Sequence, residues 1–166
     1  MTAKQAFDSY HESVFRFVYR LTRRVDTAED ITQECFLAFL RAPERWDQAR
    51  GSVRTYLFSI ARNLALKHYR DNHAGMQLDD DQLSRVIDLQ SGQELAAVVE
   101  QAVSALPDLQ KEALVLFEYE GFTLEEIASV VGADIGTVKS RLHRARERLK
   151  RTLAPYRKVG NVHGTV

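Results

Sequence analysis

The sequence has few features of a secreted, membrane or metal-binding protein. Its one cysteine, Cys35, cannot form an intramolecular disulfide, and the paired-cysteine spacings of zinc fingers are absent. No apolar run approaches the roughly 18 residues that a membrane-spanning helix needs. The N-terminal stretch MTAKQAFDSYHES lacks the apolar core of a signal peptide. We therefore expect a cytoplasmic protein without membrane insertion.

Catalytic and cofactor motifs are missing as well. The sequence has no glycine-rich phosphate loop, no cluster of metal ligands and no nucleophile elbow, and its histidines have no motif partner. The three aspartates at 79–81 lack the spacing and the closing glutamate of an EF-hand. We therefore expect no enzymatic activity, no cofactor and no bound metal.

The formal net charge is zero, because 23 basic side chains balance 23 acidic ones, but the two signs are segregated along the chain. Residues 139–166 hold nine basic side chains against one acidic side chain, whereas residues 71–100 hold seven acidic side chains against one basic side chain. The local pattern is therefore a better guide to binding partners than the net charge.

Apolar residues recur at three- and four-residue steps in two blocks, which predicts an all-α protein. Residues 1–70 form the first small helical domain, with Thr27 and Ser52 as expected helix N-caps. Residues 71–94 are polar and acidic and are typical of a flexible linker. Residues 95–154 form a second small helical domain. The tail at 155–166 has no clear periodicity and receives no assignment.

The second domain contains the signature of a helix-turn-helix. The stretch Thr123-Leu-Glu-Glu126 is a capping box that begins a short helix, and Gly132 tolerates the left-handed conformation of a tight turn. Asp134 can then cap a longer helix. A short helix, a glycine turn and a second helix is the pattern of many DNA-binding domains.

The second of these helices is amphipathic, and its two faces differ strongly. An apolar stripe at helical spacing comprises Ile135, Val138, Leu142, Ala145 and Leu149. The opposite face is polar and then basic. This basic face is either simply solvated or the DNA-contacting face of a recognition helix. Because the helix-turn-helix motif and the positive charge coincide, nucleic-acid binding is the favoured interpretation. Gly136, in the first turn, would let the helix N-terminus approach a phosphate.

These residues carry a family resemblance. The stretch GFTLEEIASVVGADIGTVKSRLHRARERLK resembles region 4 of the extracytoplasmic-function (ECF) class of bacterial sigma factors. The stretches AEDITQECFLAFLR (28–41) and GSVRTYLFSIARNLALKHYRD (51–71) resemble region 2, and the order of the regions is that of the family. The resemblance implies a transcription initiation factor that directs core RNA polymerase to specific promoters.

The resemblance also implies a division of labour. Region 2 would bind the clamp helices of the polymerase β′ subunit and melt the promoter −10 element, and region 4 would read the −35 element and dock on the β flap. Family members are often held by an anti-sigma factor, so such a partner is possible here. The alternative is a stand-alone helix-turn-helix regulator that binds DNA without polymerase.

The resemblance and the helical wheel agree on the −35 contacts. The base- and backbone-contacting positions of the family fall on Lys139, Ser140, His143 and Arg144. Arg144 suits a bidentate contact to guanine, and three further arginines suit phosphates: Arg141, Arg146 and Arg148. For His143, an exposed side chain without a specific contact is an equal alternative.

For the −10 strand, the resemblance places Trp46 and Asn63 at the pocket of an extruded base. Arg50, Ser52 and Arg54 would lie close to the strand. Arg62 joins this set from a second face of the helix at 53–70, which also carries Phe58. Phe58 is more simply explained by packing on two sides. For Trp46, a core position that closes its loop is the alternative.

The resemblance further assigns Asp30, Gln33 and Glu34 to polymerase binding. They share one helix face at i, i+3, i+4 spacing, and a solvated acidic face is the alternative. Cys35 is most simply a small buried side chain. The charge pattern adds one more prediction, that the acidic linker lies near the basic helix at 139–151 and competes with DNA.

Overall fold

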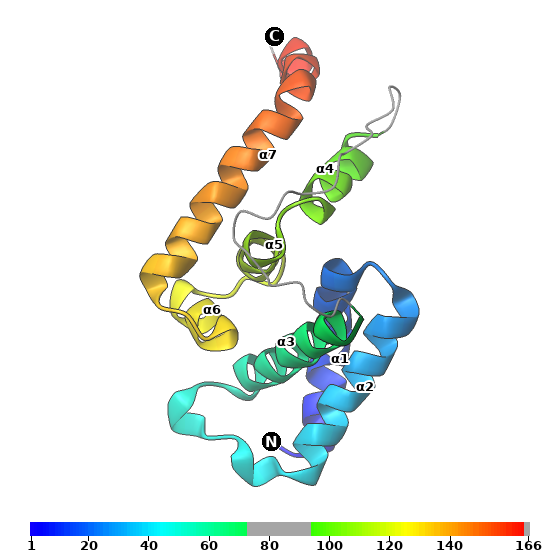
Figure 1. The fold of residues 1–166 in the computed structure, drawn as a ribbon, viewed down its shortest axis with the longest axis vertical. Coiled ribbons are helices and arrows are strands. Elements are labelled where there is room, and N and C mark those ends of the chain that lie inside the picture. The colour runs from blue at the N-terminus through cyan, green and yellow to red at the C-terminus, as the bar shows by residue number, and fades with distance from the viewer. Residues whose placement is uncertain (73–93, 165–166) are drawn as a thin grey trace.

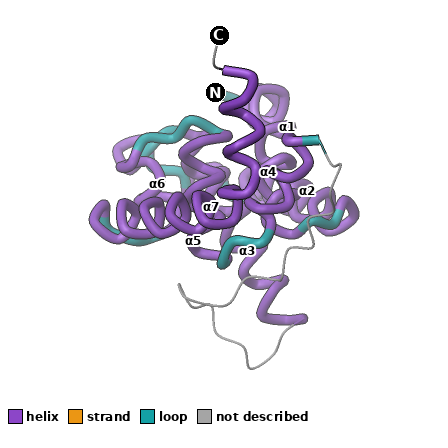
Figure 2. The backbone as a smooth tube through the Cα atoms, turned by 90° about the horizontal axis from the view of Figure 1, so that it is seen from above, coloured by secondary structure: helices purple, strands orange, loops and turns teal. Residues whose placement is uncertain are grey.

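A computed structural model describes residues 1–72 and 94–164 of the chain, with backbone alone for 157–164. The predicted linker and its aspartates at 79–81 lie outside the described residues, apart from the linker's ends, so the linker's competition with DNA stays a prediction. Every regular element in the described part is helical, which confirms the all-α prediction (Figures 1 and 2). No helix there is both long and apolar enough to cross a bilayer.

The first unit, residues 1–72, packs three helices against one another. They are α1 (Ala3–Thr22), α2 (Val25–Arg41) and α3 (Val53–Asn72), with the short 3-10 turns η1 (Pro43–Arg45) and η2 (Gln48–Arg50) between α2 and α3. Ser52 caps α3 as predicted, because its Oγ accepts the backbone N–H of Thr55 at 3.1 Å. Thr27 does not cap α2. The helix begins two residues earlier, at Val25, and Thr27 is buried inside its first turn.

The second unit, residues 94–164, contains the helix-turn-helix. Its helices are α4 (Leu95–Ser104), α5 (Asp108–Leu114), which continues into the π-helical turn η3 (Val115–Tyr119), α6 (Leu124–Val131) and α7 (Ile135–Gly164). The capping box is present at Thr123 and Glu126, and Gly132 has the predicted left-handed φ of 67°. Asp134 Oδ1 accepts the N–H of Thr137 at 2.7 Å and so caps α7.

Helix α7 is longer than the sequence indicates. The segment after Pro155, which received no assignment, continues the helix to Gly164. A proline inside a helix removes one backbone hydrogen bond and crowds the preceding turn. The residues after Pro155 have no clear apolar periodicity, so the sequence pattern ends at 154 although the helix continues.

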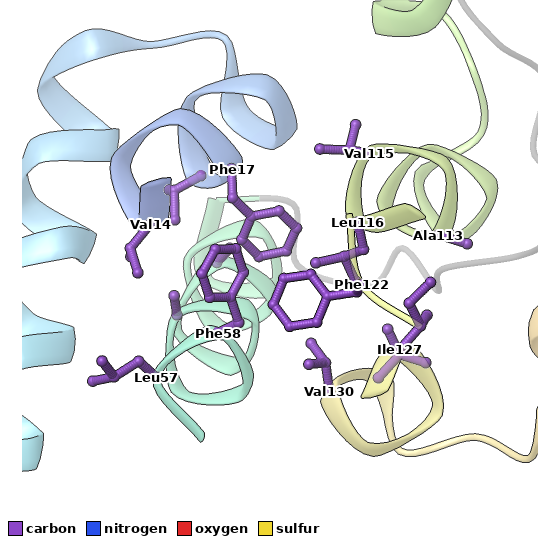
Figure 3. Close-up of a cluster of buried hydrophobic side chains, with 14 of the residues drawn as sticks. Val14, Phe17, Leu57, Phe58, Ala113, Val115, Leu116, Phe122, Ile127 and Val130 are labelled. Atoms are coloured by element: carbon purple, nitrogen blue, oxygen red, sulfur yellow. The ribbon is translucent and has the colours of Figure 1, made fainter. Parts of the chain in front are cut away.

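The two units share one hydrophobic core. The Phe58 ring on α3 lies 5.1 Å from that of Phe17 on α1 and 4.8 Å from that of Phe122, which precedes α6 (Figure 3). Phe58 is fully buried, and Figure 3 shows Leu116 and Ile127 of the second unit on the far side of Phe122. The prediction that Phe58 packs on two sides is confirmed, and the second side is the other unit.

Candidate nucleic-acid interface

The exposed edge of α7 matches the predicted −35 surface. Lys139, Ser140, His143 and Arg144 are all exposed, while Val138, Leu142 and Ala145 are buried against α5 and α6. Positions i, i+1, i+4 and i+5 of a helix lie on one edge, so the four side chains form one continuous strip, which we call the α7 edge. The structure confirms that they face outward, and their contact with DNA stays a prediction.

The three arginines assigned to phosphates have different surroundings. Arg141 is largely turned inward: its Nε and Nη1 are buried, and its charge acts on Glu112 of α5. Arg146 Nη2 lies 3.2 Å from Glu118 Oε1 within the same unit, and Arg148 is half-buried. Part of the Arg141 guanidinium therefore faces the interior, which the helical wheel did not show, and its phosphate contact stays a prediction.

The first turn of α7 has room for an external group but carries a competing charge. A Cβ added to Gly136 would lie 3.4 Å from Asp134 Oδ1, an ordinary contact, so internal packing does not require a glycine there. The backbone N–H of Thr137 holds the pKa of Asp134 below its usual value. Because the Asp134 carboxylate occupies the helix N-terminus, a phosphate approaching Gly136 would meet a negative charge.

The loop before α3 is closed by Trp46. Its indole Nε1 donates a hydrogen bond to the Gly51 carbonyl at 3.0 Å, and the ring is half-buried against the core. Arg50 and Ser52 are exposed nearby. Asn63 is exposed as well, but it lies ten residues into α3, about 15 Å along the helix axis from Val53.

Arg54 and Arg62 are only partly exposed, and both contact the second unit. Arg54 Nη2 donates to the Glu120 carbonyl, and its guanidinium lies 4.0 Å from the centre of the Phe122 ring. Arg62 donates through Nε and Nη2 to the two oxygens of Glu112, at 3.0 and 2.9 Å. In this structure the guanidinium groups of both predicted −10 residues bind groups of the second unit, and their contact with DNA stays a prediction.

Sequence reasoning missed Glu112, the partner of Arg62. Burial raises the pKa of the Glu112 carboxyl, and the charges of Arg62 and Arg141 oppose that rise. The available signal was the run LQKEALVLF, in which charged residues interrupt an otherwise apolar helix. A charged side chain at such a position is rarely buried without a partner, so the pattern could have indicated an ion pair, although not its partner.

The exposed face of α2 agrees with the polymerase assignment. Asp30, Gln33 and Glu34 are exposed together, opposite the buried Ile31 and Cys35. Their binding to polymerase stays a prediction. Cys35 is buried as expected: its Sγ donates to the Leu57 carbonyl at 3.2 Å, and burial raises the pKa of its thiol to about 12.

Comparison with known proteins identifies both units. Residues 6–74 match the Sigma-70 region 2 family, and residues 96–149 match the Sigma-70 region 4 family. The ECF RNA polymerase sigma factor EcfG of Rhodopseudomonas palustris is 33% identical over 144 residues, which cover 85% of this chain and 79% of that protein. The ECF RNA polymerase sigma factor SigC of Mycobacterium tuberculosis is 36% identical over 144 residues, covering 83% and 76%.

A solved structure agrees with these sequence matches. The sigma factor RpoE of Bartonella quintana, in complex with the anti-sigma factor NepR, has a TM-score of 0.71 and 26% identity, and the match covers 91% of this chain and 96% of that one. The chain therefore belongs to the ECF family of RNA polymerase sigma factors, alternative initiation factors that direct RNA polymerase to promoters.

Proposed function

We propose that this sigma factor reads the −35 element with the α7 edge and holds the melted −10 strand with the first unit. The observation that carries the proposal is the α7 edge itself: four polar or basic side chains exposed together on the second helix of a helix-turn-helix. A helix of this kind fits the major groove, where an arginine can bind guanine O6 and N7.

The first unit supplies the chemistry of strand capture. Trp46 offers an aromatic ring, anchored through Gly51, on which an extruded base can stack. The exposed Arg50 and Ser52 beside it can contact the sugar-phosphate backbone. Asn63 offers an amide for hydrogen bonds to a base edge further along α3.

The exposed polar face of α2 provides a docking surface for core polymerase. Asp30, Gln33 and Glu34 lie beside the exposed Leu37 and Leu40. Apolar side chains rimmed by polar ones are typical of protein interfaces. We assign this face to the polymerase clamp helices and the second unit to the β flap. The complex of the Bartonella relative also supports an anti-sigma factor as a partner of this chain.

Run-off transcription tests the proposal. Core RNA polymerase is incubated with fragmented genomic DNA, with and without the protein, and the transcript 5′ ends are mapped. We expect a discrete set of new start sites that share two upstream elements. Start sites identical to those of core polymerase alone would refute the proposal.

A stand-alone regulator is the less favoured alternative, because residues 6–74 match a polymerase-binding region that such a regulator does not need. A gel shift with the purified protein separates the two cases. The regulator predicts tight, sequence-specific binding to duplex DNA without polymerase. The sigma factor predicts that the addition of core polymerase creates the specific complex.

A further inference from the structure

The contact between the two units is built on a buried ion pair. Arg62 and Glu112 meet through two parallel hydrogen bonds, and their side chains are only 13% and 4% exposed. The two residues lie 50 positions apart, on α3 of the first unit and α5 of the second. A bidentate arginine–carboxylate pair fixes both distance and orientation, so it sets how the second unit sits on the first.

An aromatic contact lies beside the ion pair. Phe58 and Phe122 come from different units, are both almost fully buried and meet edge to face at 4.8 Å (Figure 3). Arg54 closes this contact from the side by covering the Phe122 ring and donating to the Glu120 carbonyl. Separation of the units would expose both rings and break the Arg54 hydrogen bond.

The rim of the contact shows the same charge complementarity. Arg16 of α1 lies 3.7 Å from the buried Glu120 carboxylate. Arg20 and Arg23 lie 3.9 and 4.0 Å from Glu100 of α4. Such partly exposed pairs contribute little individually. In every one of these pairs, however, the arginine belongs to the first unit and the glutamate to the second. The facing surfaces of the two units are therefore opposite in charge.

The solved relative has both units placed in a similar way. Its TM-score of 0.71 is higher than either unit alone could give, because each unit is less than half of the chain. That relative is in complex with an anti-sigma factor. This chain has a similar arrangement, and contacts between its own residues hold it.

The closed arrangement conflicts with strand binding. Arg54 and Arg62 are predicted −10 residues, yet both are engaged by the second unit, and α6 packs against α3. We propose that the free protein is held closed by its own contacts, with the Arg62–Glu112 pair as a latch, and that a DNA strand competes with Glu112 for Arg62. The strand half of this proposal rests on the proposed function, whereas the latch itself does not.

A distance measurement on the free full-length chain tests the latch. Exposed Glu12 on α1 and Ser129 on α6 are changed to cysteine and labelled for single-molecule energy transfer. The buried Cys35, with a thiol pKa of about 12, stays unlabelled. We expect one narrow, short-distance population in the parent chain. We expect a broad, longer distribution after Glu112→Gln, and also after Arg62→Met, which keeps most of the side-chain stem.

The matched control is Arg24→Gln, which removes an exposed ion pair with Asp26 inside the first unit and should leave the distribution narrow. Circular dichroism confirms that each variant remains helical. A broad distribution in the parent chain would overturn the closed state. A narrow distribution in both Glu112→Gln and Arg62→Met would overturn the role of the pair.

A binding measurement tests the competition. The probe is a fluorescent oligo(dT) strand of about 12 nucleotides, within the range of single-strand binding sites. Glu112→Gln keeps Arg54 and Arg62 and releases them from the second unit. If nine tenths of the free chain is closed, this variant should bind the probe about tenfold more tightly than the parent chain. Arg24→Gln should bind like the parent chain, and equal or weaker binding by Glu112→Gln would refute the competition.

The latch and the proposed function fail separately. If run-off transcription gives no new start sites while the distances behave as expected, the latch stands and the proposed function falls. If transcription succeeds and the distances do not depend on Glu112, the latch falls and the proposed function stands.

Discussion

Helices α3 and α7 both carry arginines that the sequence assigns to DNA, yet the structure places these arginines differently. Arg144 on α7 is exposed, whereas Arg54 and Arg62 on α3 contact the second unit. Both helices are basic, so their charge alone does not account for the difference. It comes from what lies opposite: Glu112 and Glu120 lie across from α3. Tertiary pairing, rather than the helical wheel, decides which basic residues remain exposed.

The most severe test of this comparison removes the aromatic contact of α3. Phe58→Ala should lower the free energy of unfolding by about 3–5 kcal/mol, because it leaves a cavity between Phe17 and Phe122 in the core shared by both units. Urea denaturation measures the loss. The control is Phe7→Ala, which should cost about 1 kcal/mol because Phe7 is 44% exposed. Equal losses would mean that the second face of α3 does not pack as described.

The next test concerns the α7 edge. Arg144→Ala should weaken binding of the polymerase holoenzyme to a promoter found by run-off mapping by about 1–3 kcal/mol, through the loss of a base contact. The measurement is repeated on a duplex with a scrambled −35 element, where the loss should be smaller. Arg148→Ala serves as the comparison, because a phosphate contact weakens binding to all sequences alike. Equal losses for Arg144→Ala on both duplexes would remove its role in reading bases.

A smaller effect is expected at the loop before α3. Trp46→Phe keeps an aromatic ring but loses the indole hydrogen bond to the Gly51 carbonyl. The free energy of unfolding should fall by about 1 kcal/mol, while binding of a single-stranded probe changes little because stacking is retained. Denaturation and fluorescence anisotropy measure the two quantities. A large loss of strand binding without a loss of stability would contradict the anchoring role of the hydrogen bond.

The smallest effect is expected at Cys35. Burial disfavours the charged thiolate and raises the pKa of the thiol to about 12, so the reactive thiolate is scarce below that pH. Ellman's reagent at pH 8 should therefore release no colour from the folded protein and one equivalent of thiol in urea. Rapid reaction of the folded protein would show that α2 and α3 do not cover the thiol.

Local sequence signals predicted local structure well. The Thr123 capping box, the left-handed Gly132 and the Asp134 cap are all present, because each depends on a few neighbouring residues. The prediction of Thr27 as an N-cap was wrong. The helix begins at Val25 without a side-chain cap, so the true start has no capping residue that a sequence pattern could show. The outward direction of the α7 edge was likewise predictable, since one apolar stripe fixes the opposite face.

The contacts between the units were not predictable from one sequence. Arg62 and Glu112 lie 50 residues apart, and no spacing rule joins positions across a linker. The same limit applies to Arg141, whose inward direction depends on Glu112 of another helix. Phe58 was predictable in part. The helix pattern predicted that it packs on two sides, but it did not predict Phe122 as the partner on the second side.

The buried Arg62–Glu112 pair also bears on how such proteins can be recombined. Chimeras that exchange the region 4 unit between relatives treat the two units as interchangeable modules. A donor unit with a neutral side chain in place of Glu112 would leave the Arg62 charge buried at the contact without a counter-charge. An unpaired buried charge is strongly destabilising. Exchanges should therefore carry the two residues together, or replace both with apolar side chains, so that promoter specificity can be transferred without changing how the units meet.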